Sequence, residues 1–441
     1  MLRFAMLPFR FVRRHAWLSL ALTFLGVAAA VGGVNLWAWH HYRAAEDALR
    51  VDDMDKARAH IDDCLRVWRW SSATRFLAAR IERVSGRYPQ AEAHLVECVR
   101  LQHGASEQTQ LEEVLLRAQA GDLTEVERGL WECVENNHPE KARILETLGR
   151  IYMRDSRLRA ALKALTLWLE VEPQTARGWH WRGWVHERLQ VPERAMPDYE
   201  KALDLEPGRW GVRMRLLRLI LERNNPGAAH VHLDGLVRDR PDEPEVQVAL
   251  AHCLQLEGEE EQAIQVLDRL LATHPDAFDA LALRGRLEAQ RQRPAKAEVW
   301  LREALKRRPS DLRTLYNFYQ CLEQLGKDKE AAEILQRHKR IERDTNRLAE
   351  LWGQLIERDP TNPDLLSEVG AILLRISEEE QGIQWLHRAL LASGDTHAPS
   401  MRLLMRYYES RGDAAQANDY RRALKQLNGG KPVPAAAAVD D

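Results

Sequence analysis

A pattern of small and apolar residues recurs along most of the chain about every 34 residues. One small residue marks each repeat, and a larger apolar or aromatic residue follows it four positions later. The marking positions are Ala57, Ala91, Val126, Ala161, Ala195, Ala229, Ala263, Ala297 and Ala331. In most repeats a third apolar position comes three residues further on. Offsets of four and three place side chains on one face of an α-helix, so the pattern predicts an amphipathic helix in each repeat.

Each repeat also contains a second helical pattern, upstream of the first, and several repeats end near a proline. The upstream pattern is seen in Leu145, Leu148, Gly149 and Tyr152. The prolines stand where a helix must stop, at Pro173, Pro207, Pro241, Pro275 and Pro309. The repeat is therefore predicted to be helix, turn, helix, turn. Because one helix pair cannot bury its own apolar face, we expect the pairs to stack into a continuous core.

This repeat resembles that of the tetratricopeptide family. The best match contains Trp179, Gly183, Ala195, Tyr199, Ala202 and Pro207, with Arg182 and His186 departing from the family pattern. The preceding repeat matches at Leu145, Leu148, Gly149, Tyr152, Ala161, Leu165 and Pro173, with Trp168 in place of the second alanine. The resemblance implies an all-α fold, a right-handed superhelical solenoid of helix-turn-helix units. It also implies that the concave face of the solenoid binds a segment of a partner protein.

Residues 16–39 form an uncharged, apolar run that predicts one transmembrane helix, a signal anchor. A helix of this length crosses a hydrocarbon core of roughly 30 Å. Trp17 stands at one end and Trp37 and Trp39 at the other, where indoles favour the membrane interfaces. Residues 1–15 carry the basic side chains Arg3, Arg10, Arg13 and Arg14. The positive-inside rule then predicts a cytoplasmic N-terminus and repeats on the far side, and the arginine- and alanine-rich composition suggests a bacterial inner membrane.

Two further interpretations of this segment remain open. The basic start, apolar middle and small residues at Ala28, Ala29 and Ala30 also fit a cleaved signal peptide and soluble export, although the apolar run is longer than usual. Gly26 with Ala30 forms a small-xxx-small pair that would let two such helices pack closely. A homodimer through this face is therefore an alternative to a monomer.

The register of the repeats changes after Ala331. The pattern predicts a repeat array of about nine units over residues 40–343. The next matches come at Gly382 and Ala417, half a unit out of step. Residues 344–428 are thus predicted to hold an inserted or prolonged helix followed by about two repeat-like units. Residues 429–441 lack apolar periodicity and are predicted to be a disordered tail.

Composition narrows the classes of function. Lysine plus arginine number 64 against 66 aspartate plus glutamate, so the balance gives no general reason to expect nucleic-acid binding. The five cysteines include no Cys-x-x-Cys pair and are expected to be free core thiols. No metalloprotease, nucleophile-elbow, phosphate-loop or dinucleotide motif is found, so we predict no enzyme and no catalytic, cofactor or metal site. His230 with His232 is a poor chelating pair, and the acidic run from Glu257 is interpreted as a solvated turn.

The resemblance places the first helix of each unit on the concave face. Transferred by register, the groove residues are Arg143, Arg150, Arg177, His180, Trp181, Trp184, Arg215, Arg218, His252, Arg286, Arg313, Tyr316 and Asn317. Arginines interleaved with aromatic rings suit an acidic or C-terminal peptide segment. The alternative is that the arginines pair with nearby acids and the tryptophans pack between units.

These patterns together favour a non-catalytic, membrane-tethered scaffold or adaptor that binds protein partners in its groove. The alternative is an accessory subunit that recruits or positions a membrane or envelope enzyme. The two differ in what binds, because an accessory subunit has one enzyme partner in equal amount that carries its activity.

Overall fold

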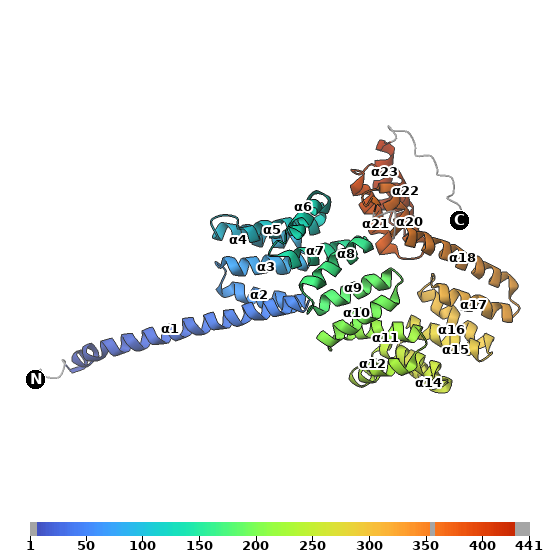
Figure 1. Cartoon of the computed structure of the whole chain (residues 1–441), viewed down its shortest axis with the longest axis horizontal. Helices are drawn as coiled ribbons and strands as arrows, with labels where there is room; N and C mark the ends of the chain where they lie inside the picture. The colour runs from blue at the N-terminus through green and yellow to red at the C-terminus, as the bar shows by residue number, and fades with distance from the viewer. Residues whose placement is uncertain (1–6, 353–357, 428–441) are drawn as a thin grey trace, which may run out of the picture. The chain divides into compact units, whose positions relative to one another are not determined.

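The computed structural model describes residues 7–352 and 358–427, with side chains from residue 22 onward. Within these ranges the chain is α-helical apart from short π-helical segments and the turns, and no strand is found in them. The solenoid of helix pairs expected from the sequence is confirmed (Figure 1). The chain separates into two compact units, Met1–Thr147 and Leu148–Asp441. The tail predicted at residues 429–441 lies outside the described residues.

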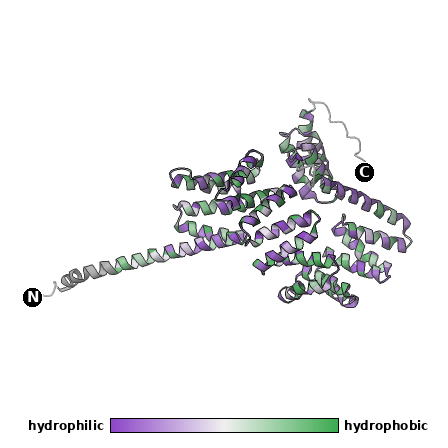
Figure 2. Ribbon diagram, viewed as in Figure 1, coloured by the Kyte–Doolittle hydropathy of each residue, from purple (hydrophilic) through white to green (hydrophobic). Residues whose placement is uncertain are grey.

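The chain begins with the long helix α1 (Leu7–Arg50). By length and composition α1 is able to cross a membrane, a test that a signal sequence also passes. Its apolar side chains are uncovered, with Leu22 68% and Phe24 77% exposed, and Figure 2 shows this apolar stretch. From Ala38 onward the same helix is buried against α2 (Met54–Val67). Thus α1 also supplies the first helix of the first pair.

The first unit continues with short helices of about the predicted length. After α2 they are α3 (Ser72–Val84), α4 (Tyr88–Leu101), α5 (Glu107–Arg117), the π-helix η1 (Ala118–Asp122) and α6 (Leu123–Glu135). The π-helix contains Gly121 at φ 132°, a backbone conformation that glycine adopts without steric cost. It lies where the spacing of the repeats lengthens from 34 to 35 residues, just before Val126. Helix α7 (Lys141–Arg154) crosses the boundary between the units.

Helix α8 pairs with α7. Five further helix pairs, from α9 to α18, follow in the second unit before the register changes. Its helices up to that point are α8 (Leu158–Val171), α9 (Ala176–Arg188), α10 (Pro192–Leu205), α11 (Trp210–Glu222), α12 (Pro226–Asp239), α13 (Pro244–Leu256), α14 (Glu260–Thr273), α15 (Phe278–Gln290), α16 (Pro294–Arg307), α17 (Leu312–Gln324) and α18 (Asp328–Glu350). The last helices are α20 (Pro363–Arg375), α21 (Glu379–Ala392), α22 (Ala398–Ser410) and α23 (Ala414–Leu427).

Local sequence signals set where these helices begin and end. Asp311 caps α17 by accepting a hydrogen bond from the backbone N–H of Thr314 at 2.8 Å. Several helices begin with proline, whose missing N–H is not needed in the first turn. Turns after the first helix of a pair use residues with positive φ, such as Gly258 and Gly326.

The small residues that mark the repeats lie where the two helices of a pair meet. Ala161, Ala195 and Ala263 are fully buried, whereas Val126 is only partly buried. The larger residue four positions later, such as Tyr199 or Leu267, is also fully buried. Tyr199 belongs to a core cluster that extends from α10 to α13, so buried side chains join successive helix pairs.

Helix α18 explains the change of register. It has 23 residues, whereas its neighbours have 13 or 14. Its Ile341 packs with α16 and α17, and its Leu348 packs with α20 and α21. Arg347 holds α18 to α20 through Glu368, with Nε 2.7 Å from Oε1. One prolonged helix therefore serves two successive parts of the core.

Candidate functional site

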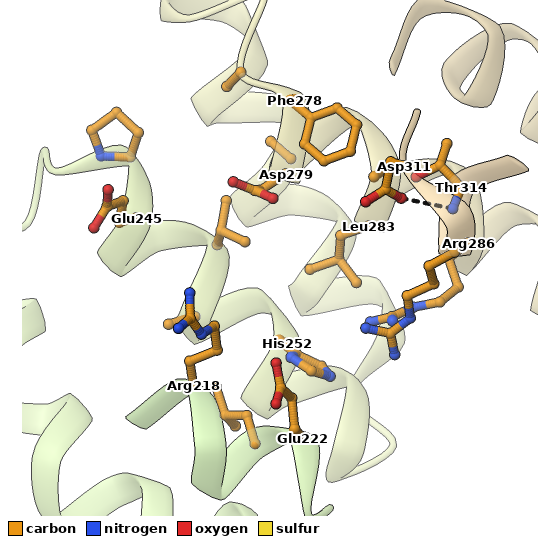
Figure 3. Close-up of a pocket in the computed structure, with 18 of the residues that line it drawn as sticks. Arg218, Glu222, Glu245, His252, Phe278, Asp279, Leu283, Arg286, Asp311 and Thr314 are labelled. Carbon is orange, nitrogen blue, oxygen red and sulfur yellow. Dashed lines mark hydrogen bonds between the residues drawn. The ribbon is translucent and has the colours of Figure 1, made fainter. Parts of the chain in front are cut away.

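A groove of about 800 Å³ lies along the second unit (Figure 3). Its floor comes from the first helices of four successive pairs, α11, α13, α15 and α17. The side chains from these helices include Met214, Arg215, Arg218, Glu222, Val248, His252, Leu283, Arg286, Arg313 and Asn317. This is the face that the resemblance to the tetratricopeptide family marks as concave.

The helical repeat divides each of these helices between groove and core. On α13, His252 lines the groove whereas its neighbour Cys253 is fully buried. On α15, Arg286 lines the groove whereas Leu287 is fully buried in the core. Packing of the core face against the second helices thus fixes which side chains the groove receives.

Two arginines that line the groove, Arg286 and Arg313, have no carboxylate within ion-pair distance in the described residues. Arg286 donates from Nη2 to Oε1 of Gln255 at 2.8 Å, and its buried Nε has no hydrogen-bond partner in the described residues. Burial, and then the charge of Arg313, lower the pKa of Arg286 to about 10. In the part of the chain that the structure describes, neither arginine forms an ion pair. Figure 3 shows Arg286 and His252 pointing into the groove.

His252 is neutral at pH 7. Burial is the main cause that lowers its pKa to about 4, and the charges of Arg286 and Arg313 lower it further. A neutral imidazole both donates and accepts hydrogen bonds. An anion that enters beside the imidazole raises its pKa and favours the protonated form.

The remaining charged groups of the groove are mostly paired. Arg215 and Arg218 share Glu187, with Arg215 Nη1 3.4 Å from Glu187 Oε2. Arg308 lies 3.5 Å from Asp279 and covers the ring of Phe278 at 4.4 Å. Three acidic residues, Glu222, Glu245 and Asp311, also line the groove and form no ion pair with the described residues.

The structure brings only part of the predicted groove set to this place. Arg215, Arg218, His252, Arg286, Arg313 and Asn317 all line the groove. Tyr316 is exposed on α17 but stands outside the lining residues, with its ring 5.8 Å from that of His338.

Arg143 takes part in a buried ion network of the first unit. Its side chain is 11% exposed and its Nη2 lies 2.6 Å from Oε2 of Glu112. Arg83 binds the other oxygen of Glu112 and also donates to Gln119 at 2.9 Å. The network joins α3, α5, η1 and α7.

The predicted residues of α7 and α9 form a packed stack of rings and guanidinium groups. Trp181 lies 5.7 Å from Trp168, ring to ring. Arg150 covers Trp181 at 5.1 Å, and Arg177, which is 9% exposed, lies 5.4 Å from the same ring.

His180 and Trp184 lie beside this stack. The ring of His180 is 6.1 Å from that of Tyr199, and burial, followed by Arg209 and Arg215, lowers its pKa to about 4. Arg188 covers Trp184 at 5.7 Å.

Sequence reasoning missed the residues at one end of the groove. Phe278, Asp279, Arg308 and Asp311 come from the turns and first residues of α15 and α17. A signal for Phe278 exists in the sequence, because Trp210, Pro244, Phe278 and Leu312 recur at the start of successive first helices. The acidic residues beside them carry no such repeat.

Comparison with known proteins identifies the repeat. Residues 146–209 match one model of the tetratricopeptide repeat, and residues 192–247 and 221–287 match another. No curated protein sequence matches the chain.

Solved structures with related helix pairs are distant in sequence. A tetratricopeptide repeat protein from Parabacteroides merdae is 14% identical, with 61% of this chain and 93% of that chain covered and a TM-score of 0.44. YrrB, a tetratricopeptide repeat protein with an unusual peptide-binding site, is 20% identical over 42% of this chain and 96% of its own, with a TM-score of 0.35. PilW, a type IV pilus biogenesis factor, is 19% identical over 53% of this chain and 98% of its own, with a TM-score of 0.38. The recurring helix pairs, their spacing and the matches to the repeat models together show that the chain contains tetratricopeptide repeats, which the models match over residues 146–287.

Proposed function

We propose that the chain is a membrane-tethered scaffold that holds an acidic segment of a protein partner in the groove of α11, α13, α15 and α17. The observation that carries this proposal is the pair Arg286 and Arg313, which line the groove and form no ion pair with a described carboxylate. Taking an ionised side chain out of water is costly unless a counter-charge is supplied. A partner carboxylate supplies it, and the planar guanidinium group binds both carboxylate oxygens at once.

The apolar part of the groove defines the segment further. Phe278 is 9% exposed, and Met214, Val248 and Leu283 lie along the same surface. A peptide that places an apolar side chain next to its carboxylate satisfies both parts of the groove. A cleft of about 800 Å³ suits a short extended or helical segment rather than a folded domain.

The membrane tether is supported by the uncovered apolar face of α1. Apolar side chains as exposed as Leu22 and Phe24 are unfavourable in water, and a bilayer removes that cost. Trp68 donates from Nε1 to Oδ1 of Asn35 at 2.8 Å, so the first helix pair begins within the last few residues of the apolar span 16–39. The pair therefore stands directly at the membrane surface in this proposal.

Aromatic and basic side chains gather at that level of the first unit. Trp70 is 62% exposed and Arg69 covers it at 4.8 Å, while Arg43 covers Trp39 at 5.6 Å. Indoles favour the membrane interface, and arginine beside them reaches the lipid headgroups. The turn between α2 and α3, which carries Arg69 and Trp70, is the part of the scaffold proposed to rest on the bilayer. By the positive-inside rule it lies on the extracytoplasmic side.

The mechanism is binding without a covalent step. One end of the chain is held in the membrane, which confines encounters with membrane-associated partners to a thin layer and raises their effective concentration. The groove is built from rigid helices, so the scaffold itself loses little conformational entropy on binding.

Crosslinking in intact cells, followed by purification of the full-length chain and mass spectrometry, tests the groove. The informative variants are Arg313→Glu and the double variant Arg286→Glu with Arg313→Glu. The matched control reverses two exposed charges on second helices, Arg269→Glu with Lys296→Glu. We expect the partner to be lost from the groove variants and kept by the control, with circular dichroism showing that each variant remains helical.

The outcome also separates the proposal from its alternative. Equal recovery of every partner by the Arg286 and Arg313 variants contradicts the groove proposal. Recovery of one enzyme in equal amount, with its activity, supports an accessory subunit instead.

The tether is tested separately by placing a cysteine at the exposed Lys296. In spheroplasts, a membrane-impermeant maleimide is expected to label Lys296→Cys without lysis, and the chain is expected to resist extraction by alkaline carbonate. An intact mass that lacks the first 30 or so residues supports the signal-peptide alternative.

A further inference from the structure

Four side chains from two neighbouring helices gather on the second unit, away from the groove. His230 and Asp234 lie one turn apart on α12, and Cys253 and Glu257 lie one turn apart at the end of α13. His230 Nε2 is 2.9 Å from Glu257 Oε1 and 3.7 Å from Cys253 Sγ. The ligand atoms of His230, Cys253 and Glu257 all lie within 4.8 Å of one another. We propose that these three residues bind a zinc ion.

The separations of His230 from the other two ligand atoms are close to those around a tetrahedral zinc ion. Zinc binds imidazole nitrogen at about 2.0–2.1 Å, thiolate at about 2.3 Å and carboxylate oxygen at about 2.0–2.2 Å. Tetrahedral angles then place the ligand atoms roughly 3.3–3.8 Å apart. The His230 to Cys253 distance is already in this range, and the His230 to Glu257 distance requires only a small opening. Thiolate with imidazole selects zinc over magnesium or calcium, which prefer oxygen ligands.

Asp234 holds His230 in the orientation that such a site requires. Its Oδ1 lies 3.0 Å from Nδ1 of His230. A carboxylate at Nδ1 keeps a proton on that nitrogen, so a metal ion binds at Nε2, which faces Cys253 and Glu257. Carboxylate, histidine and metal in this order are the usual arrangement around protein-bound zinc.

The neighbouring repeats show that the repeat itself does not demand this set of residues. One repeat earlier the three positions hold Met196, Leu219 and Arg223, and one repeat later Ile264, Leu287 and Arg291. Two repeats later the cysteine recurs as Cys321, which donates to the backbone oxygen of Pro294 at 2.9 Å, but Glu298 and Leu325 replace the histidine and the glutamate. A cysteine in this position is thus compatible with the fold without a metal. Of these four junctions, only the one between α12 and α13 combines the three ligand types.

The consequence of binding is a link between two successive helix pairs. Cys253 coordinates as the thiolate and His230 through a deprotonated Nε2, and the released protons pass to solvent. The ion then joins the second helix of one pair to the first helix of the next. Glu257 and His230 have side chains 31% and 40% exposed, so the fourth position is open to water or to a ligand from outside the chain.

A cobalt titration of the full-length chain in detergent, stripped of metal and kept reduced, tests the site. Cobalt(II) bound to a thiolate gives a charge-transfer absorption band in the near ultraviolet. We expect one equivalent of cobalt to produce the band and zinc to abolish it by displacement. The band is expected to disappear in Cys253→Ser and to persist in the matched control Cys321→Ser.

Two conservative variants separate ligation from folding. Asp234→Asn is expected to weaken the affinity roughly 10- to 100-fold, as carboxylates behind a metal-bound histidine do. His230→Gln is expected to weaken it at least as much while leaving the far-ultraviolet circular dichroism unchanged. No band in the wild-type chain, equal loss of the band in Cys321→Ser, or full affinity in His230→Gln overturns the proposal.

Discussion

Gly183 packs directly against the ring of Tyr199, and a β-carbon at Gly183 would lie 2.8 Å from Tyr199 Cδ1. It would also lie 3.2 Å from the backbone oxygen of Ala195, which cannot move without shifting α10. We therefore expect Gly183→Ala to lower the free energy of unfolding by about 1–3 kcal/mol, because overpacking outweighs the higher helix propensity of alanine. Urea unfolding followed by circular dichroism measures the change.

Gly235 provides the matched control for this prediction. It lies within α12, and a β-carbon there would meet no atom within 4 Å. Gly235→Ala is expected to raise the free energy of unfolding by about 0.5–1 kcal/mol, the ordinary gain in a helix interior. A stabilisation of the same size by Gly183→Ala would show that the helices of this pair are not in close contact.

Glu112 is the centre of the ion network in the first unit. It is 1% exposed, and although burial raises its pKa, the charges of Arg83 and Arg143 lower it more, so the net shift is downward. Glu112→Gln leaves the buried Arg83 without a counter-charge and Arg143 with Glu140 alone, and is expected to cost about 3–5 kcal/mol. The exposed neighbour is the control, because Glu113→Gln should change the free energy of unfolding by less than about 0.5 kcal/mol.

The same network predicts that the free energy of unfolding decreases at acid pH. Because the pKa of Glu112 is lower in the folded chain, its contribution is complete above the pKa of the unfolded carboxyl. The contribution is lost as the pH falls through the folded pKa. Thermal unfolding of the wild type and of Glu112→Gln should therefore converge at low pH, and a constant difference would contradict this role.

The fold was predictable because its signals are local and repeated. Small residues such as Ala195 recur at a fixed interval, and the close approach of two helices requires them. The prolonged α18 was visible as a slip of register after Ala331. The partial exposure of Val126 was not, because it depends on the π-helix and the turn at Gly121.

The groove was predictable only where the face of a helix decides the position of a side chain. Arg286 and Arg313 follow from the register of α15 and α17. The stack of Trp168 and Trp181 depends on how bulky rings fill the space between helices, which the register does not contain. The cluster at His230 joins residues of two helices, so spacing within one helix, such as His230 to His232, does not find it.

His180 predicts a loss of stability at mildly acid pH. Burial first, and then Arg209 and Arg215, lower its pKa to about 4, whereas an unfolded histidine titrates near 6.5. The unfolded chain then binds the extra proton, so this contribution to stability is complete above about pH 6.5 and falls between pH 6.5 and 4. Between pH 7 and 5 the loss is about 2 kcal/mol.

Urea unfolding at pH 7 and pH 5 checks this sign. His180→Gln cannot be protonated and is expected to lose about 2 kcal/mol less than the wild type on acidification. His274→Gln removes an exposed histidine and serves as the control. An acid loss that is unchanged in His180→Gln would place the proton uptake elsewhere.

His252 predicts that the affinity of the proposed groove for its peptide increases on acidification, whereas His180 predicts that stability decreases. Its pKa in the free chain is about 4, because it is buried beside Arg286 and Arg313. A bound carboxylate neutralises that environment and raises the pKa, so proton uptake accompanies binding, and affinity increases as the pH falls. If the pKa of His252 in the complex reaches about 6, the affinity rises roughly tenfold between pH 7 and pH 5.

The measurement is fluorescence anisotropy with a glutamate- and phenylalanine-rich peptide that carries a pH-insensitive dye, since glutamate stays largely ionised above pH 5. The wild type should show the increase and His252→Gln should bind with the same affinity at both values. An increase of equal size in both chains would mean that another group takes up the proton, and no binding by either chain would count against an acidic partner.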